Sequence, residues 1–228
     1  MKALRLPLSL AILFFATFCS QAAQTNSLLN SWLASQTNFQ TWSADFIQTR
    51  NLKSLAKPLT ASGHISFAAP NRFHWEIKEP SPTIALRAES ELWVIYPKLK
   101  RAERYPLSGS AAGPWRDTLA LLEAGFPRSE ADIESKFRIQ SQTLTNDLCE
   151  VTLQPKSASA RRMMPLLRIA FSTNDFSLRA TELQFADGST MRNDFTNGVF
   201  NPTLPADLFS PQISADFTIT EPTGANRR

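Results

Sequence analysis

Apolar and polar residues alternate along much of this chain, a pattern typical of strands with one buried face. The clearest example lies between Phe67 and Pro80. From position 72 onward the apolar residues are Phe73, Trp75 and Ile77, and the polar residues between them are Arg72, His74, Glu76 and Lys78. Two large aromatic rings on one face of a strand indicate a deep apolar space. The functional question is whether protein or a ligand fills it.

Short alternating segments of this kind recur along the chain, separated by Pro, Gly or charged turns, and predict an antiparallel meander. The first half holds Ala44–Leu52, Gly63–Ala68, Arg72–Lys78, Thr83–Ala88 and Leu92–Tyr96. The second half holds Lys136–Leu144, Leu148–Gln154, Leu166–Ser172, Leu178–Ala186 and Thr190–Thr196, with a last segment near Asp216–Thr220. Some ten strands predict one strongly curved antiparallel sheet, an incomplete β-barrel in a fold that is mainly β with α.

Two segments have helical spacing instead, and both are expected to cover the concave face of the sheet. In the first, from Ser27 to Asn38, the residues that share one stripe are Leu28, Leu29, Trp32 and Leu33. In the second, Trp115, Leu119 and Leu122 follow Gly113-Pro114, and the pattern ends at Gly125-Phe126-Pro127. This second helix lies between Gly-, Ser- and Pro-containing segments, so it is predicted to be either a core plug or a movable lid.

The N-terminus has the features of a secretory signal peptide. Lys2 and Arg5 precede the apolar run Leu6–Phe18, and the small residues Ala22 and Ala23 follow it. The run is shorter than the roughly 20 apolar residues that a spanning helix needs. The expected organisation is a cleaved signal over residues 1–23, a single domain over 24–222 and a flexible tail over 223–228. We therefore expect a soluble protein of the periplasm.

The charge balance and the cysteine content exclude some kinds of partner and of covalent cross-link. Removal of the signal takes away Lys2 and Arg5 and no acidic residue, so the formal net charge falls from +4 to +2. A nearly balanced charge gives no reason to expect nucleic acid as a partner. The signal also takes Cys19 with it, which leaves Cys149 alone and excludes an intramolecular disulfide.

Residues with catalytic or metal-binding chemistry are sparse. The histidines are His64 and His74, both among polar neighbours in their strands, and no cysteine or carboxylate cluster accompanies them at ligand spacing. Cys149 lies between Leu148 and Val151 in an alternating segment, which favours a quiet, half-buried thiol. We therefore expect no metal, no cofactor and no enzymatic activity. An enzyme acting on lipids, using Cys149, His64 or His74, is the weakest of the alternatives.

The inward-facing positions are unusually rich in aromatic residues. A curved sheet of about ten strands encloses more volume than two short helices fill, and barrels of this size commonly hold an apolar ligand. The sequence thus predicts a cavity suited to an acyl chain. Its expected lining residues are Phe46, Ile65, Phe67, Phe73, Trp75, Ile77, Trp93, Phe171 and Phe185, and its expected lid residues are Trp115, Leu119 and Leu122.

Several motifs resemble one family, the periplasmic outer-membrane lipoprotein carrier LolA. They are Ala44-x-Phe46-x-Gln48, Gly63, Phe67-x-x-Pro70-Asn71-Arg72-Phe73-x-Trp75, Pro80, Leu92-Trp93-x-x-Tyr96-Pro97, and the stretch from Asn201 to Phe209. The resemblance implies an incomplete barrel whose cavity takes the acyl chains of a lipoprotein. It also implies an inner-membrane LolCDE-type transporter as donor, an outer-membrane LolB-type receptor as acceptor, and a monomeric carrier without catalytic activity.

Two departures from the family matter. Many of its members have an arginine immediately before the proline of the signature strand, whereas this chain has Ala69, and Arg72 is the nearby cation that could contact a lid or assist transfer. The segment Asn51–Leu59 is more similar to LolA-related proteins found beside lipid or polyene biosynthesis enzymes, so the cargo could be another acylated molecule. A module that binds a protein partner, its cavity packed solid, is the alternative from a different functional class.

Overall fold

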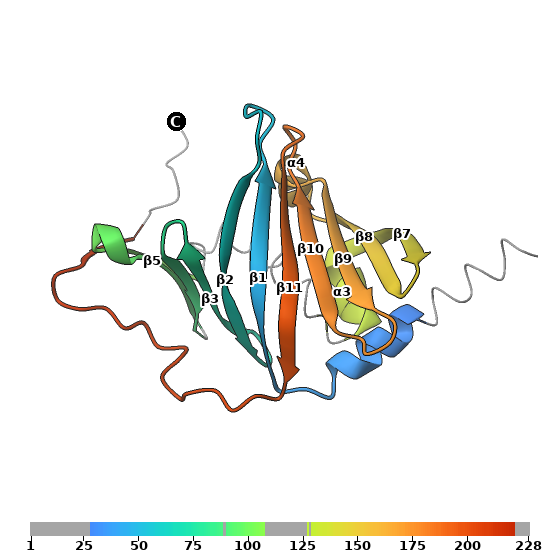
Figure 1. Ribbon diagram of the computed structural model, residues 1–228, viewed down its shortest axis with the longest axis horizontal. Coiled ribbons are helices and arrows are strands. Elements are labelled where there is room, and N and C mark those ends of the chain that lie inside the picture. Colours follow the sequence, from blue (N-terminus) through green and yellow to red (C-terminus); the bar gives the residue numbers. More distant parts are fainter. Residues whose placement is uncertain (1–27, 89, 108–126, 128, 222–228) are drawn as a thin grey trace, which may run out of the picture.

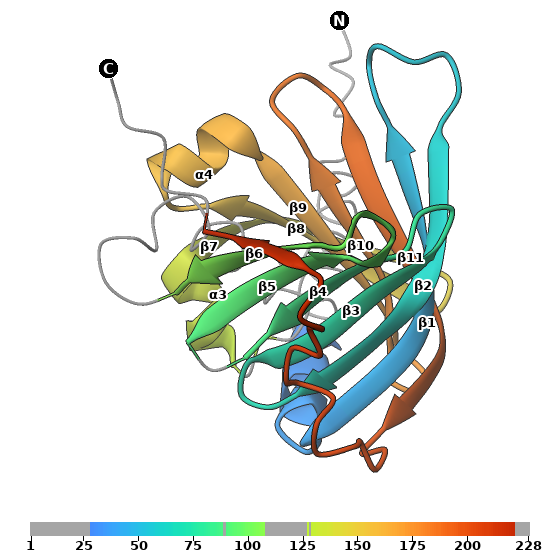
Figure 2. The same ribbon diagram turned by 90° about the vertical axis from the view of Figure 1, so that its left-hand side faces the viewer.

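The computed structural model describes residues 28–88, 90–107, 127 and 129–221. Its strands form one 12-stranded sheet in the order β12-β6-β5-β4-β3-β2-β1-β11-β10-β9-β8-β7. Neighbouring strands are antiparallel, apart from the short parallel pair of β12 and β6. The sheet is strongly curved and stays open between its two edge strands (Figures 1 and 2). The prediction of an incomplete β-barrel in a mainly β fold is therefore confirmed.

The elements have the following bounds. The strands are β1 (Thr41–Asn51), β2 (Leu59–Ala68), β3 (Arg72–Glu79), β4 (Thr83–Arg87), β5 (Glu91–Tyr96), β6 (Arg101–Pro106), β7 (Phe137–Thr145), β8 (Leu148–Pro155), β9 (Leu166–Ser172), β10 (Leu178–Gln184), β11 (Thr190–Phe200) and β12 (Thr218–Thr220). The helical segments are residues 28–36, the 3-10 turn η1 (Pro97–Leu99), α3 (Glu130–Lys136) and α4 (Ala158–Met163).

Three elements of the structure were not predicted from the sequence. Strand β6 was not predicted, because its charged residues interrupt the alternation on which the prediction relied. Residues 155–164 contain a second unpredicted element, α4, whose first turn is capped where the Ala160 N–H donates to the Ser157 hydroxyl at 3.4 Å. Helix α3 was also missed, and the Ser129 hydroxyl caps it by accepting a hydrogen bond from the Asp132 N–H at 3.1 Å.

The first helix packs on the concave face, as its apolar stripe predicts. The rings of Trp32 and Phe171 stack with their centroids 4.7 Å apart and their planes 4° from parallel. Leu29 and Leu33, which lie on the same side of this helix, are buried in the same apolar cluster. The helix therefore covers the part of the sheet formed by β9 and its neighbours.

The outer face of the sheet differs between its two halves. Across β8, β9, β10 and β11 it carries an ionic network in which Arg168 pairs with Glu150 and Glu182, while Arg192 pairs with Glu182 and Asp194. Across β4 and β5 the outer face is instead apolar, with Ile84, Leu86, Trp93 and Ile95 in one cluster. Residues 201–217 cross it as an extended strap, and Phe209 of this strap is buried against it (Figure 2).

Gly63 lets the sheet bend beneath the aromatic side chains. The pairing of β2 with β3 is irregular between Ser62 and Gly63, and Gly63 lies directly opposite Phe46 of β1. A β-carbon at this position would lie 2.0 Å from the Glu76 carbonyl oxygen and 2.6 Å from Cζ of Phe46. No side chain fits there, so glycine is required for this close approach of strand and ring.

Several predictions fall outside the described residues. These are the signal over 1–23, the helix that holds Trp115, Leu119 and Leu122, and the tail over 223–228. The proposed single domain over 24–222 stays a prediction.

Candidate functional site

Strand register brings six of the predicted lining residues onto one face. Opposite residues in an antiparallel pair point to the same side of a sheet. Phe46 lies opposite Gly63, which in turn lies opposite Ile77. Ile65 faces Trp75, and Phe67 faces Phe73. The concave face of β1, β2 and β3 therefore presents Phe46, Ile65, Phe67, Phe73, Trp75 and Ile77 together.

The rings on this face touch one another. The Phe46 and Trp75 centroids are 4.6 Å apart, and Trp75 also meets Phe195 of β11 edge to face at 6.2 Å. Phe195 in turn meets Trp42 edge to face at 5.5 Å. Four aromatic side chains from three strands thus form a continuous apolar wall, which we call the aromatic wall. Such a surface can bind an apolar chain through burial and dispersion.

Phe171 and Phe185 belong to the same concave cluster, but Trp93 does not. Phe171 is fully buried beneath Trp32, and Phe185, in the turn after β10, packs against the edge of the cluster. Trp93 lies opposite Leu86 and is buried on the outer face under the strap. Its prediction as a concave residue was wrong because both faces of β5 are buried, so alternation cannot tell which face is concave.

Polar groups lie beside the aromatic wall on the same face. The Gln48 amide donates to the side-chain oxygen of Asn193 at 3.0 Å, and the Asn193 amide donates to the Thr181 hydroxyl at 3.2 Å. The guanidinium of Arg50 donates to Gln48 at 2.8 Å. Both side chains are buried, and each amide donates one of these hydrogen bonds and accepts another. This chain of hydrogen bonds was not predicted from the sequence, although strand alternation does place Gln48 on the same face as Phe46.

The groups with reactive chemistry are dispersed. Cys149 is buried opposite Leu144 and Phe171, and burial raises the pKa of its thiol. His64 faces outward and contacts the Asp45 carboxylate at 2.8 Å, while Asn197 donates to the other oxygen of that carboxylate at 2.9 Å. These two hydrogen bonds lower the pKa of Asp45. Within the described residues, no group of three or more His, Cys, Asp or Glu side chains could hold a metal ion.

A family comparison decides how this concave surface is interpreted. The family model described as outer membrane lipoprotein carrier protein LolA matches residues 37–212. The chain belongs to the LolA family.

Individual LolA proteins are similar over most of their length. The outer-membrane lipoprotein carrier protein of Nitrosospira multiformis is 28% identical over 206 residues, which are 90% of this chain and 93% of that protein. That of Chromobacterium violaceum is 28% identical over 173 residues, with 75% and 76% covered. Among solved structures, an uncharacterized conserved protein from Thermus thermophilus shares the fold with a TM-score of 0.51 and 9% identity, over 88% of this chain and 99% of that one.

The cations near the LolA signature strand lie on opposite faces. Ala69, in the family's arginine position, packs against the concave cluster. The guanidinium of Arg72 lies 5.0 Å from the ring centroid of Phe209 on the outer face, so Arg72 is directed away from the concave side on which a lid was expected. Arg87 of β4, opposite Phe73, is instead on the concave face, where burial lowers its pKa. The sequence analysis missed Arg87 because a single arginine in a short strand carries no motif.

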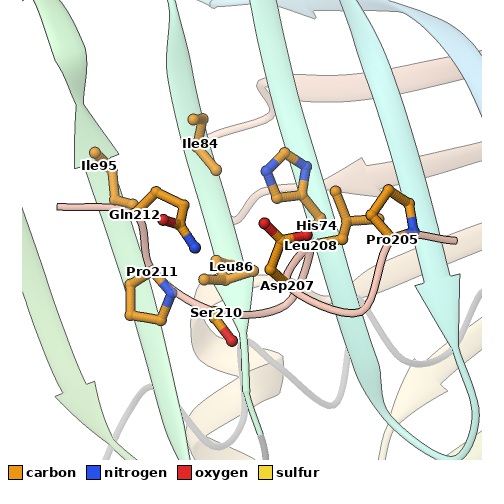
Figure 3. Close-up of a pocket in the computed structure, with 10 residues that line it drawn as sticks. All are labelled: His74, Ile84, Leu86, Ile95, Pro205, Asp207, Leu208, Ser210, Pro211 and Gln212. Atoms are coloured by element: carbon orange, nitrogen blue, oxygen red, sulfur yellow. The ribbon is translucent and has the colours of Figure 1, made fainter.

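The strap leaves a pocket on the outer face of this LolA domain. It has a volume of about 260 Å³ and lies between the strap and β3, β4 and β5. Figure 3 shows its lining residues, which are His74, Ile84, Leu86, Ile95, Pro205, Asp207, Leu208, Ser210, Pro211 and Gln212. His74 was expected on a wet surface, but the strap leaves it only partly exposed.

Because His74 is partly buried, its contribution to the stability of the protein depends on pH. The pKa of His74 lies below its usual value, chiefly because burial disfavours the charged ring; His64 lowers it further and Glu76 raises it. Asp207 lies beside the ring on the strap (Figure 3). Above about pH 6.5 the ring is neutral in both the folded and the unfolded state. As the pH falls below that value, the unfolded chain binds a proton that the folded protein resists, so stability falls until the lowered pKa is passed.

We therefore expect the free energy of unfolding to decrease on acidification below about pH 6.5. The decrease should be about 1.4 kcal/mol for each pH unit by which the pKa of His74 is lower in the folded than in the unfolded state. Urea unfolding at neutral and mildly acidic pH measures the loss. In His74→Gln this contribution should vanish. An equal acid-induced loss in the variant would show that other groups are responsible.

No helix among the described residues is long and apolar enough to cross a membrane.

Proposed function

We propose that this protein is a periplasmic carrier that holds the acyl chains of a lipoprotein, or of a related acylated molecule, and moves them from the inner to the outer membrane. The observation that carries the proposal is the aromatic wall on the concave face of β1, β3 and β11. Membership of the LolA family and the printed names of its relatives support the same role.

The physical need for such a carrier is clear. Burying one methylene gains about 0.8 kcal/mol, so an acyl chain of roughly fifteen methylenes gains on the order of 10 kcal/mol when it leaves water. An acylated molecule therefore does not cross an aqueous compartment unaided at a useful rate. A concave apolar surface replaces the membrane during transit, and the chemistry requires no bond to be made or broken. We accordingly propose a binding protein without enzymatic activity and without a cofactor.

The proposal extends to partners. An inner-membrane LolCDE-type transporter would load the carrier, and an outer-membrane LolB-type receptor would unload it. The carrier would act as a monomer. The segment with Trp115, Leu119 and Leu122 stays the proposed lid, because reversible loading requires a movable cover that exchanges contacts with the wall for contacts with the cargo.

Native mass spectrometry with lipid extraction tests the proposal on protein purified gently from a bacterial periplasm. Acylated species bound to the protein would support it and begin to identify the cargo. Protein that carries no lipid and also fails to bind a fluorescent fatty-acyl probe would contradict it. The concave face would then be filled by side chains, and a module that binds a protein partner would replace the carrier.

A further inference from the structure

Three segments meet at one end of the sheet. They are the β1–β2 hairpin, the β10–β11 hairpin and α4, all at the top of Figure 1, and the β10–β11 hairpin lies between the other two (Figure 2). The Lys53 N–H donates to the Ser189 hydroxyl at 3.1 Å, which joins the two hairpins. The Ala186 N–H donates to the Met163 carbonyl oxygen at 3.1 Å, which joins the second hairpin to α4. We call residues 50–60, 156–165 and 185–190 the basic rim.

Positive charge is concentrated on the basic rim. Its cations are Arg50, Lys53, Lys57, Lys156, Arg161 and Arg162, and its one carboxylate is that of Asp187. The chain has 24 Lys and Arg residues, of which six lie in the rim, and 20 Asp and Glu residues, of which one lies there. The rest of the chain therefore has 18 basic and 19 acidic residues. The net positive charge of the protein thus comes from this one end. The neighbouring end of β3 adds Lys78 and Glu79, which balance each other.

Large apolar side chains are exposed among these cations. Leu55 and Leu59 of the first hairpin are 47% and 48% exposed, and Met163 at the end of α4 is 41% exposed. An isolated exposed leucine is ordinary, but these three apolar side chains lie at the same cationic end, on two segments that are linked through the β10–β11 hairpin, and they make this end amphipathic. The Asn51–Leu59 segment, singled out by its departure from the LolA pattern, supplies two of the three.

The composition of the basic rim favours lipid over protein as its partner. Protein interfaces are enriched in aromatic residues, methionine and arginine and depleted in lysine. The rim also contains arginines and methionines, so the features that separate it from a protein interface are its lysines and its lack of exposed aromatic residues. The rim has three lysines, and its one aromatic residue, Phe185, packs against the core. Lys and Arg interspersed with exposed aliphatic side chains instead match an anionic bilayer, where headgroup phosphates bind the cations and the upper acyl region accepts the aliphatic groups.

We propose that the basic rim rests on the surface of an anionic phospholipid membrane, with Lys53, Lys57 and Arg162 against headgroup phosphates and Leu55 and Met163 at the edge of the acyl region. The contact is weak and reversible, since a few cations and two or three aliphatic side chains do not anchor a protein. It uses none of the residues of the aromatic wall, and so it holds whether or not the protein carries lipid.

Vesicle co-sedimentation of the purified full chain tests this docking. We expect binding to vesicles of mixed phosphatidylglycerol and phosphatidylcholine, little binding to phosphatidylcholine alone, and a decrease as salt is raised. Lys53→Gln with Lys57→Gln should weaken the partition roughly thirtyfold, because each cation near the surface contributes about a factor of five. Leu55→Gln should weaken it about tenfold.

Matched controls lie elsewhere on the molecule. Lys98→Gln with Arg179→Gln removes the same charge, and Leu99→Gln removes an exposed leucine from η1, so both should bind vesicles like the parent protein. Absence of vesicle binding by the parent protein, or equal weakening in the control variants, would overturn the proposal; an acidic protein surface would then be the partner to seek. Affinity for a fatty-acyl probe, measured on the same variants, should be unchanged, which separates failure of docking from failure of the carrier proposal.

Discussion

Gly63→Ala is expected to lower the free energy of unfolding by about 3 kcal/mol or more. The added β-carbon would overlap the Glu76 carbonyl oxygen, to which it would lie at 2.0 Å, and press on the buried ring of Phe46. Neither group can move aside without a large cost in free energy. The carbonyl belongs to the neighbouring strand, and the centroid of the Phe46 ring lies 4.6 Å from that of Trp75. Denaturant unfolding followed by tryptophan fluorescence measures the loss.

Gly198→Ala is the matched control. A β-carbon at Gly198, also in a strand, would have its nearest contact with Nε1 of Trp42 at 3.5 Å, an ordinary van der Waals distance. We expect its stability to stay within about 1 kcal/mol of the parent protein, since alanine has less conformational entropy to lose than glycine. Similar unfolding midpoints for the two variants would mean that the bend at Gly63 is not sterically required.

Ile77→Glu is expected to lower the affinity for a fluorescent fatty-acyl probe at least tenfold. Ile77 lies opposite Gly63 on the concave face, next to the aromatic wall, and is only partly buried, so the fold should tolerate the change. A carboxylate there must either lose its hydration or keep water beside the acyl chain, and both outcomes cost several kcal/mol of binding free energy. Probe titration measures the affinity, and circular dichroism confirms the fold.

Ile47→Glu makes the same chemical change on the opposite face. Ile47 is 55% exposed on the outer side of β1, one residue after Phe46, so its variant should bind the probe like the parent protein. If Ile77→Glu also binds with parental affinity, acyl chains do not lie on the concave face. The aromatic wall would then no longer support the carrier proposal.

Alternation was sufficient where one face of a strand is buried and the other is wet. Phe46, Ile65, Phe73 and Trp75 were placed on one face from period-2 spacing, and the strand register confirms that placement. The same reasoning failed for β5, where Leu92, Trp93 and Ile95 are all buried. Two buried faces remove the contrast on which the method depends, so Trp93 was assigned to the wrong side.

The error at β5 has a tertiary cause. The strap, residues 201–217, follows β11 and crosses the outer face of β3, β4 and β5, far away in the sequence (Figure 2). It covers Trp93, receives the guanidinium of Arg72 on Phe209, and partly buries His74. Each of these residues follows a polar or alternating pattern in its own strand. The local sequence therefore does not indicate that a segment more than a hundred residues downstream covers it.

The sequence by itself determined the class of fold, the curved sheet and the aromatic character of its concave face, because side-chain alternation and turn chemistry are local properties of the chain. Its signature motifs also indicated the LolA family. Only the tertiary structure decided which face each residue of β5 occupies, that the Gln48 amide donates to Asn193, and that two hairpins and α4 gather the positive charge at one end. These features depend on contacts between segments distant in sequence, whose pairing is set by the packing of the whole sheet.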